Sequence, residues 1–145
     1  MPTNPNSPLT LGQRARVRQT LEALGAQIEP VALLFYGRLF ELDPSARRLF
    51  HIDLAVQSRK IMETLETIAK SLEQFNLLTE RLAELGRKHA SYGVRPDQYE
   101  SVTNALMWAL AQALGPDFDR PTREAWALTL ALVCEAMQRG ASSNS

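Results

Sequence analysis

The fold of this chain is decided by one stretch, residues 85–99, which reads LGRKHASYGVRPDQY. Leucines recur upstream at spacings of four and then three residues, the inward stripe of an α-helix, at Leu78, Leu82 and Leu85. The next position on that stripe is His89, so a histidine stands where a core leucine is expected. Gly93 and Pro96 follow shortly afterwards, and both favour the end of the helix. The sequence therefore predicts an inward-facing histidine near the end of a helix.

An inward-facing histidine requires a partner, because burial of an unpaired imidazole costs free energy. His89 can be interpreted as a core residue whose ring is hydrogen-bonded to a backbone carbonyl, or as a metal ligand. The other histidine is His51, and the chain has neither the Cys-x-x-Cys nor the His-Glu-x-x-His spacing of a bare metal site. A lone histidine can still hold iron when a macrocycle supplies the other donor atoms, as haem does. Both interpretations stay open on these residues alone.

Length and composition indicate one globular domain. The chain has 145 residues and a mass of 16.2 kDa, with 45% hydrophobic and 22% charged residues. Its 16 basic and 16 acidic residues cancel, which argues against a nucleic-acid surface or a polybasic membrane anchor. The single cysteine, Cys134, excludes an intramolecular disulfide and is expected to be a small buried hydrophobe. Without a signal-like segment or an apolar run of about 18 residues, we expect a cytoplasmic protein that does not enter the membrane.

Helical periodicity extends over nearly the whole chain, with no strand alternation, internal repeat or interdomain linker. Residues 1–9, rich in proline and asparagine, are expected to form a flexible arm, and residues 141–145 a disordered tail, with one domain over 10–140 between them. Thr10 can cap the first helix, which is expected to stop near Gly25. The class is therefore all-α, with helices expected near residues 10–25, 29–42, 45–50, 55–72, 76–91, 97–115 and 121–137.

Two further polar residues, Tyr36 and Gln57, lie on or beside apolar helix faces. Taken singly, Tyr36 fits an ordinary core tyrosine with its hydroxyl at the rim, and Gln57 fits a solvated first turn. Taken together with His89, they offer a phenol, an amide and an imidazole from three helices to one shared cavity. A diatomic ligand gains partial negative charge when it coordinates iron, and each hydrogen bond to a charged group contributes roughly 1.5–3 kcal/mol. Two such donors would slow the escape of the ligand by orders of magnitude.

Four stretches of the sequence match a known family. They are LFYGRLF at residues 34–40 followed by Asp43-Pro44, LF at 49–50, QSRKIM at 57–62, and residues 85–99. Over about residues 10–137 the chain resembles a globin, and in particular the single-domain bacterial globins related to the haem domain of flavohaemoglobins. The resemblance implies a globin fold of about seven to eight helices packed around one pocket for haem b, iron protoporphyrin IX.

The resemblance also implies roles for individual residues. His89 would be the proximal ligand to the haem iron, and Phe50 would stack on the porphyrin and wedge it in place. Tyr36 and Gln57 would be the distal pair that hydrogen-bonds oxygen. Ile61 would form a steric wall one helical turn beyond Gln57.

Further residues are implied to contact or flank the haem. Lys60 can reach a haem propionate, although a solvated lysine is an equal alternative. Because His51 directly follows Phe50, we expect His51 to be exposed or at a propionate rather than on the iron, so that ferrous iron is five-coordinate. The corner between Phe50 and Gln57 is shorter than in flavohaemoglobins, which leaves the reach of Gln57 open. The side chains implied to line the proximal side are Leu85, Val94, Tyr99, Val102 and Leu106.

Departures from flavohaemoglobins bear on the activity. In that family a tyrosine and a buried glutamate tune the proximal histidine and favour oxygen activation. Tyr99 matches the tyrosine, but the last helix offers no clear glutamate, since Glu135 falls too early in the sequence. We also expect no flavin or nicotinamide domain, and an autonomous nitric-oxide dioxygenase is therefore disfavoured.

The leading hypothesis is a haem protein that reversibly binds oxygen for storage, transport or scavenging, with nitric oxide and carbon monoxide as further gaseous ligands. One alternative is a nitric-oxide dioxygenase, or a peroxidase-like side activity, that depends on a separate reductase. Another alternative is a globin-fold sensor or haem-free interaction module.

Overall fold

The computed structural model describes residues 7–49 and 53–142, and these residues are helical with no β-strand among them. Within these ranges lie six α-helices: α1 (Leu11–Leu24), α2 (Ile28–Leu42), α3 (Leu54–Lys70), α4 (Phe75–Ser91), α5 (Pro96–Leu114) and α6 (Arg120–Ser142). Four short 3₁₀ helices connect them: η1 (Gly25–Gln27), η2 (Pro44–Leu49), η3 (Leu72–Gln74) and η4 (Gly115–Asp117). Each helical segment expected from the sequence is found, with η2 as the expected short helix, so the all-α prediction is confirmed.

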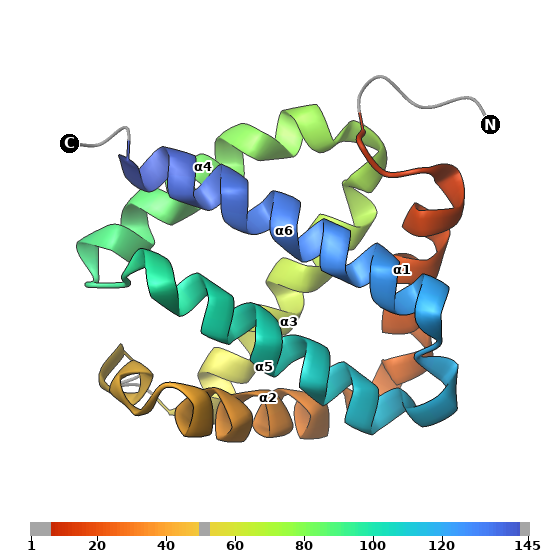
Figure 1. Cartoon of the computed structure of the whole chain (residues 1–145), viewed down its shortest axis with the longest axis horizontal. Helices are drawn as coiled ribbons and strands as arrows, with labels where there is room; N and C mark the ends of the chain where they lie inside the picture. Colours follow the sequence, from red (N-terminus) through yellow and green to blue (C-terminus); the bar gives the residue numbers. More distant parts are fainter. Residues whose placement is uncertain (1–6, 50–52, 143–145) are drawn as a thin grey trace.

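Helices α2 and α3 form one group and helices α4 and α6 form another, and α5 contacts both groups (Figure 1). α2 packs against α3 and α5, and α4 packs most extensively against α6. α5 also contacts α6, and α1 contacts both α3 and α6. Neither α2 nor α3 packs extensively against α4. The helices predicted to carry Tyr36 and Gln57 therefore lie in one group, and the helix predicted to carry His89 lies in the other.

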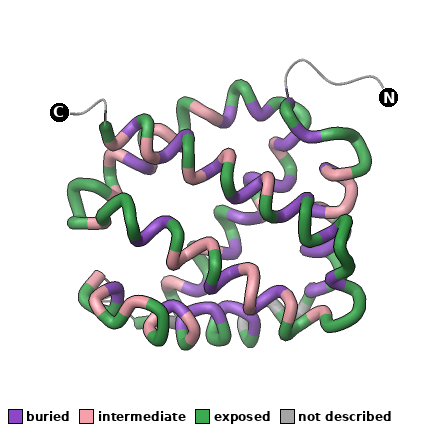
Figure 2. Tube along the Cα trace, viewed as in Figure 1, coloured by how far each residue is buried: buried purple, intermediate pink, exposed green. Residues whose placement is uncertain are grey.

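The core lies between these groups, where the inward faces of the helices meet (Figure 2). Apolar side chains at helical spacing supply it, as the periodicity predicts. Burial of such side chains contributes roughly 1.5–3 kcal/mol each relative to exposure. The largest fully buried residues include Trp126 on α6, Phe35 and Leu39 on α2, and Leu110 on α5.

α4 and α6 cross with their backbones in direct contact. A Cβ atom added to Gly86 would lie 1.8 Å from the carbonyl oxygen of Met137, and one added to Gly140 would lie 2.0 Å from that of Ala83. Only glycine fits at either position, because a neighbouring backbone cannot move aside as a flexible side chain can. This contact fixes the last turns of α4, where His89 lies, and no pattern in the sequence identified it.

The ends of the packed domain differ from the expected ones. Leu9, expected in a flexible arm, is fully buried, and Arg14 Nη1 donates a hydrogen bond to its carbonyl oxygen at 2.7 Å. The predicted cap at Thr10 is present as a reciprocal pair of hydrogen bonds with Gln13, at 2.9 and 3.1 Å. Helix α6 continues to Ser142, beyond the expected start of the tail. Residues 1–6 and 143–145 lie outside the described residues.

The structure also bears on the expected burial of Cys134 and on the expected absence of a membrane-spanning helix. Cys134 is half-buried rather than buried, and its Sγ lies 3.5 Å from Thr103 Oγ1. Burial nevertheless raises the pKa of the Cys134 thiol, so the sulfur is protonated at neutral pH. Among the described residues, no helix combines the length and the apolar character that crossing a membrane requires.

Candidate functional site

His89 lies in the last turn of α4 with its ring half-buried. Its Nδ1 lies 2.9 Å from the carbonyl oxygen of Leu85. A carbonyl oxygen can only accept a hydrogen bond, so Nδ1 carries the proton and the lone pair is on Nε2. The hydrogen-bonded ring and the metal ligand, which the sequence left as alternatives, are therefore compatible. The bond to Leu85 orients the ring, and Nε2 has no hydrogen-bond partner among residues 7–49 and 53–142.

The protonation state of His89 also suits a metal ligand. Burial lowers the pKa of the imidazole, and the hydrogen bond that the ring donates to the backbone carbonyl of Leu85 opposes that change only in part. The neutral ring is therefore the main form at pH 7. A neutral imidazole oriented by a backbone carbonyl is a common arrangement for a histidine ligand.

The backbone after His89 is closed by local hydrogen bonds. Val94 N donates to the carbonyl oxygen of His89 at 3.0 Å, and Tyr92 N approaches the same oxygen at 3.1 Å. Gly93 adopts a φ of +95°, a left-handed conformation that favours glycine. Pro96 then occupies the first turn of α5. The sequence signals for the end of the helix thus act as predicted, and they fix the loop that follows the candidate iron ligand.

Tyr36 on α2 is only 2% exposed. Its ring contacts that of Phe35, with centroids 5.0 Å apart, and that of Phe40, with centroids 6.2 Å apart. Burial raises the pKa of Tyr36 to about 12, because the phenolate would lose its hydration. The hydroxyl therefore keeps its proton at any physiological pH and can act as a hydrogen-bond donor. Phe40, one turn from Tyr36, is a neighbour that sequence reasoning did not identify as part of the site.

Gln57 lies in the first turn of α3 and is half-buried. The start of this helix is fixed by Asp53, whose side chain accepts a hydrogen bond from Ala55 N at 3.0 Å and whose carbonyl accepts one from Gln57 N at 3.2 Å. Ile61, one turn farther along α3, is half-buried, whereas Lys60 is exposed. Because α2 and α3 pack together, Tyr36 and Gln57 come from neighbouring helices.

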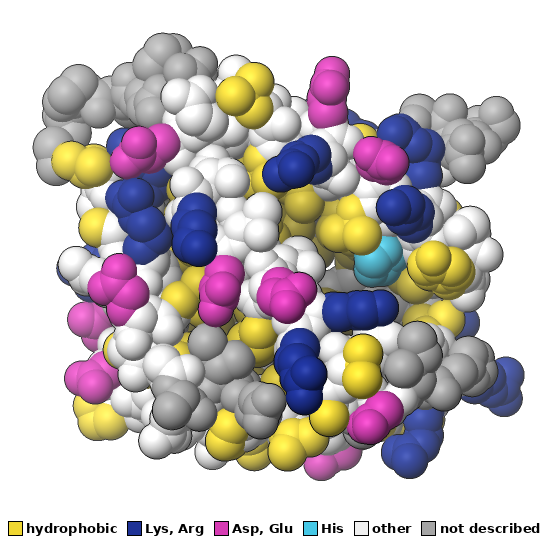
Figure 3. Space-filling view, turned by 180° about the vertical axis from the view of Figure 1, so that it is seen from behind, with side chains coloured by type: hydrophobic (Ala, Val, Ile, Leu, Met, Phe, Trp, Pro, Cys, Tyr) yellow, Lys and Arg dark blue, Asp and Glu magenta, His cyan; other side chains and the backbone are white. Residues whose placement is uncertain are grey.

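Most of the apolar side chains predicted to line the haem are half-buried. Tyr99 and Leu106 lie within the core, but apolar side chains on α2, α3, α4, α5 and the loop before α5 are only half-buried. Figure 3 shows the imidazole in cyan beside a hollow bordered by hydrophobic, Lys and Arg side chains. A planar apolar macrocycle would cover such surface next to His89, so the residues present fit haem. The predicted residues that are half-buried are Ile61, Leu85, Val94 and Val102, and Phe40, which was not predicted, is half-buried as well.

The remaining predicted residues have different outcomes. Phe50 and His51 lie outside the described residues, so their predicted roles stay predictions. Glu135 is exposed and pairs with Arg139, as expected for a residue that does not reach the proximal side. Burial raises the pKa of Tyr99, and the neighbouring thiol Cys134 contributes in the same direction. Among the described residues, no group of three or more His, Cys, Asp or Glu side chains could hold a bare metal ion.

The comparison with known families identifies the class. The globin family profile matches residues 33–137, and the chain belongs to the globin family. It is 29% identical to neuroglobin-1 of Oncorhynchus mykiss over 94% of both chains. It is 30% identical to a neuroglobin of Chaenocephalus aceratus, covering 88% of this chain and 89% of that one.

A solved structure supports the fold independently. The crystal structure of a hexacoordinated heme protein from an anhydrobiotic tardigrade at pH 4 superposes with a TM-score of 0.84 at 15% identity, covering 97% of this chain and 99% of that chain. At this identity the likeness shows the fold alone. The predicted globin fold is therefore confirmed, and membership of the family implies haem binding and small gaseous ligands such as oxygen.

Proposed function

We propose that this globin binds oxygen reversibly at a five-coordinate ferrous haem b, with His89 as the protein ligand to iron. Haem iron supplies the electron-rich centre to which diatomic gases bind. The observation that carries the proposal is the 2.9 Å contact between His89 Nδ1 and Leu85 O, which directs the lone pair to Nε2. Because burial keeps the ring neutral near pH 7, this lone pair is available for coordination.

The proposed role of Tyr36 is to donate a hydrogen bond to a ligand that gains negative charge. Its raised pKa keeps the phenol protonated, and its burial limits competition from water. Gln57 is proposed as a second donor through its amide. Since Gln57 is half-buried, we expect its hydrogen bond to contribute less than that of Tyr36. Ile61 would limit the space beside these donors.

The proposed five-coordinate state differs from that of the similar tardigrade protein, which is a hexacoordinated heme protein. The position in the first turn of α3 carries the amide of Gln57, and a neutral amide is a weaker iron ligand than imidazole. His89 is the one histidine within residues 7–49 and 53–142, which favours an open sixth position in the ferrous protein. His51 is the remaining internal candidate for that position.

Finer aspects of the proposal rest on the sequence. The pair Tyr36 and Gln57, with Tyr99, supports a likeness to the haem domains of flavohaemoglobins and to single-domain bacterial globins. Lys60 is proposed to contact the haem edge, and Phe50 the haem face.

Nitric oxide and carbon monoxide are proposed as further ligands of the haem iron. The cytoplasm is proposed as the location of the protein.

Oxygen binding is favoured over oxygen chemistry by the surroundings of Tyr99. Glu135 is exposed and pairs with Arg139, and burial is the main cause that raises the pKa of Tyr99, beside which lies the Cys134 thiol. A thiol is protonated and uncharged here, so it cannot push electron density toward the proximal histidine as a buried carboxylate would. Nitric-oxide dioxygenation with a separate reductase remains the second hypothesis. Turnover of nitric oxide with an added ferredoxin or flavin reductase distinguishes the two.

The test is the visible absorption spectrum of the purified protein after haem addition, in the ferric state, after dithionite reduction, and after exposure to oxygen. We expect one broad ferrous band that splits into two stable bands with oxygen. Sharp ferrous bands before any gas is added would contradict the five-coordinate assignment. In that case His51→Ala identifies the internal ligand, because this change would restore the broad band. A protein that stays colourless with added haem would favour the interaction-module hypothesis.

A further inference from the structure

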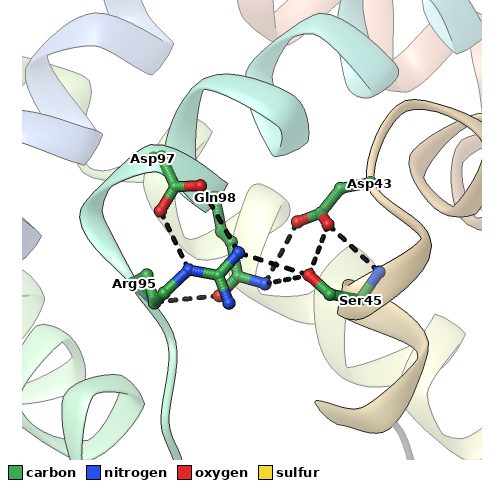
Figure 4. A network of polar contacts seen from close by, with 5 residues as sticks. All are labelled: Asp43, Ser45, Arg95, Asp97 and Gln98. Carbon is green, nitrogen blue, oxygen red and sulfur yellow. Dashed lines mark hydrogen bonds and ion pairs between the residues drawn. The ribbon is translucent and has the colours of Figure 1, made fainter.

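A network of polar side chains joins the end of α2 to the start of α5 (Figure 4). Gln98 is its centre and is only 3% exposed. Its Nε2 donates to Asp43 Oδ2 at 3.1 Å and lies 3.4 Å from Ser45 Oγ, while its Oε1 accepts a hydrogen bond from Arg95 N at 2.8 Å. Both ends of this buried amide are therefore paired, one with the segment that follows α2 and the other with the loop that precedes α5.

The partners of Gln98 are themselves fixed. Asp43 Oδ1 accepts hydrogen bonds from the backbone N and the hydroxyl of Ser45. These contacts, together with Gln98, lower the pKa of Asp43, so the acceptor is a carboxylate at neutral pH. Arg95 donates to Ser45 Oγ at 3.3 Å and is held by Asp97 through two contacts, at 3.1 and 3.4 Å. We call these five residues, Asp43, Ser45, Arg95, Asp97 and Gln98, the 43–98 network.

The position of the 43–98 network relates it to both sides of the candidate iron site. Asp43 directly follows α2, the helix of Tyr36. Arg95 ends the loop that follows His89, and within this loop Val94 N bonds to the carbonyl oxygen of His89 at 3.0 Å. Since α2 does not pack extensively against α4, this network supplies a polar connection between the distal helix and the proximal loop.

We propose that Asp43 and Gln98 are positioning residues for the haem site, which hold the loop after His89 at a fixed place relative to α2. The inference rests on the proposed function for its effect on iron, but the contacts themselves belong to the protein alone. A hydrogen bond from a buried amide to a carboxylate is stronger than one between neutral groups. Its loss frees the loop of residues 91–95, and the bond between Val94 N and His89 O then opens more often. The orientation of the imidazole at iron becomes less uniform as a result.

The test compares Gln98→Leu with two matched variants. Gln112→Leu makes the same change at an exposed position of the same helix and controls for loss of an amide on α5. Asp43→Asn removes the charge but keeps an oxygen that can accept from Gln98. Three quantities are measured: amide hydrogen exchange of residues 91–95 in the protein without haem, the ferrous iron–histidine stretching band by resonance Raman, and the rate of haem loss.

For Gln98→Leu we expect the rate of amide exchange in the loop and the rate of haem loss each to rise by about tenfold, because one hydrogen bond to a charged group is lost. The iron–histidine stretching band should shift or broaden. Asp43→Asn should change each quantity less, and Gln112→Leu should leave all three unchanged. If Gln98→Leu fails to fold, Asp43→Asn carries the test, and we then expect a smaller rise in the same direction.

Two results would overturn the inference. One is unchanged exchange in the loop of Gln98→Leu or of its substitute. The other is faster exchange without any change in the stretching band or in haem loss, since the network would then only stabilise the fold. A wild-type protein that binds no haem would contradict the proposed function, and with it the role of the 43–98 network at iron. Normal haem binding by the wild-type protein, with all three quantities unchanged in the variants, would contradict the positioning role alone.

Discussion

The proximal and distal sides of the candidate site are held by different kinds of contact. On the proximal side, α4 lies on α6 with backbones touching at Gly86 and Gly140, and the His89 ring is bonded to the carbonyl oxygen of Leu85. On the distal side, Tyr36 packs against the rings of Phe35 and Phe40, and Gln57 lies half-buried in the first turn of α3. Backbone contacts fix the first side, and side-chain packing shapes the second.

The two kinds of contact indicate which property each side controls. Backbone-to-backbone contact tolerates no added atom, so the proximal side should govern folding and haem retention. Side chains on the distal side can change with little effect on the fold, because each is replaceable by an isostere without moving a helix. Substitutions there should alter the rate of ligand escape instead. The following predictions test this division, beginning with the largest effect.

The largest effect is expected for His89→Ala, which removes the proposed protein ligand to iron. Loss of a group that only orients a metal ligand costs about 10–100-fold in affinity, so we expect haem affinity to fall by more than about a thousandfold. The apoprotein should keep its helical circular dichroism spectrum. Added imidazole should restore part of the haem spectrum by occupying the space that the ring leaves. Haem retained as firmly, with the same ferrous spectrum, would show the proximal assignment to be wrong.

Gly86→Ala tests the backbone contact between α4 and α6. Its Cβ would lie 1.8 Å from Met137 O, so the helices must separate, and we expect the free energy of unfolding to fall by about 3 kcal/mol or more. Urea denaturation of the apoprotein measures this change. Gly37→Ala is the matched control, because its Cβ meets nothing within 4 Å on helix α2. That control should stabilise the protein by about 0.5–1 kcal/mol. Equal effects of the two changes would refute the special role of the α4–α6 crossing.

Tyr36→Phe tests the distal donor. One hydrogen bond to a charged ligand is lost, so we expect the oxygen dissociation rate to rise by at least about tenfold, with haem affinity nearly unchanged. Because burial raises the pKa of Tyr36 to about 12, the phenol stays protonated below that value. The effect of the substitution should therefore be the same between about pH 6 and pH 9. Tyr92→Phe, at a 73% exposed tyrosine, should leave the rate unchanged. A Tyr36→Phe rate equal to wild type would exclude the proposed hydrogen bond.

The smallest effect is expected for Gln57→Leu. A half-exposed amide is screened by water, so we expect the oxygen dissociation rate to rise only about threefold, measured by stopped-flow mixing. Gln74→Leu, at an exposed glutamine beyond the same helix, is the control. A change as large as that of Tyr36→Phe would mean that Gln57 reaches the ligand as directly as the phenol does. The distal side would then have two equal donors rather than one dominant donor.

The sequence by itself determined the local features of this protein. Apolar spacing located the six α-helices and the short helix η2, Thr10 capped α1 as predicted, and Gly93 with Pro96 ended the turn after His89. His89 and Tyr36 were identified because each interrupts or accompanies an apolar stripe, a pattern visible within a few turns of one helix. Such features depend on residues close together in the chain, so a single sequence is enough to predict them.

Only the tertiary structure decided the contacts between distant segments. The Gly86–Met137 and Gly140–Ala83 approaches and the pairing of Gln98 with Asp43 each join residues far apart in the chain. A glycine or glutamine has no periodic signal that says which distant backbone or carboxylate it will meet, because that depends on how whole helices cross. The candidate iron ligand, His89, could be identified from the pattern of one helix, while its placement depends on the helices packed around it.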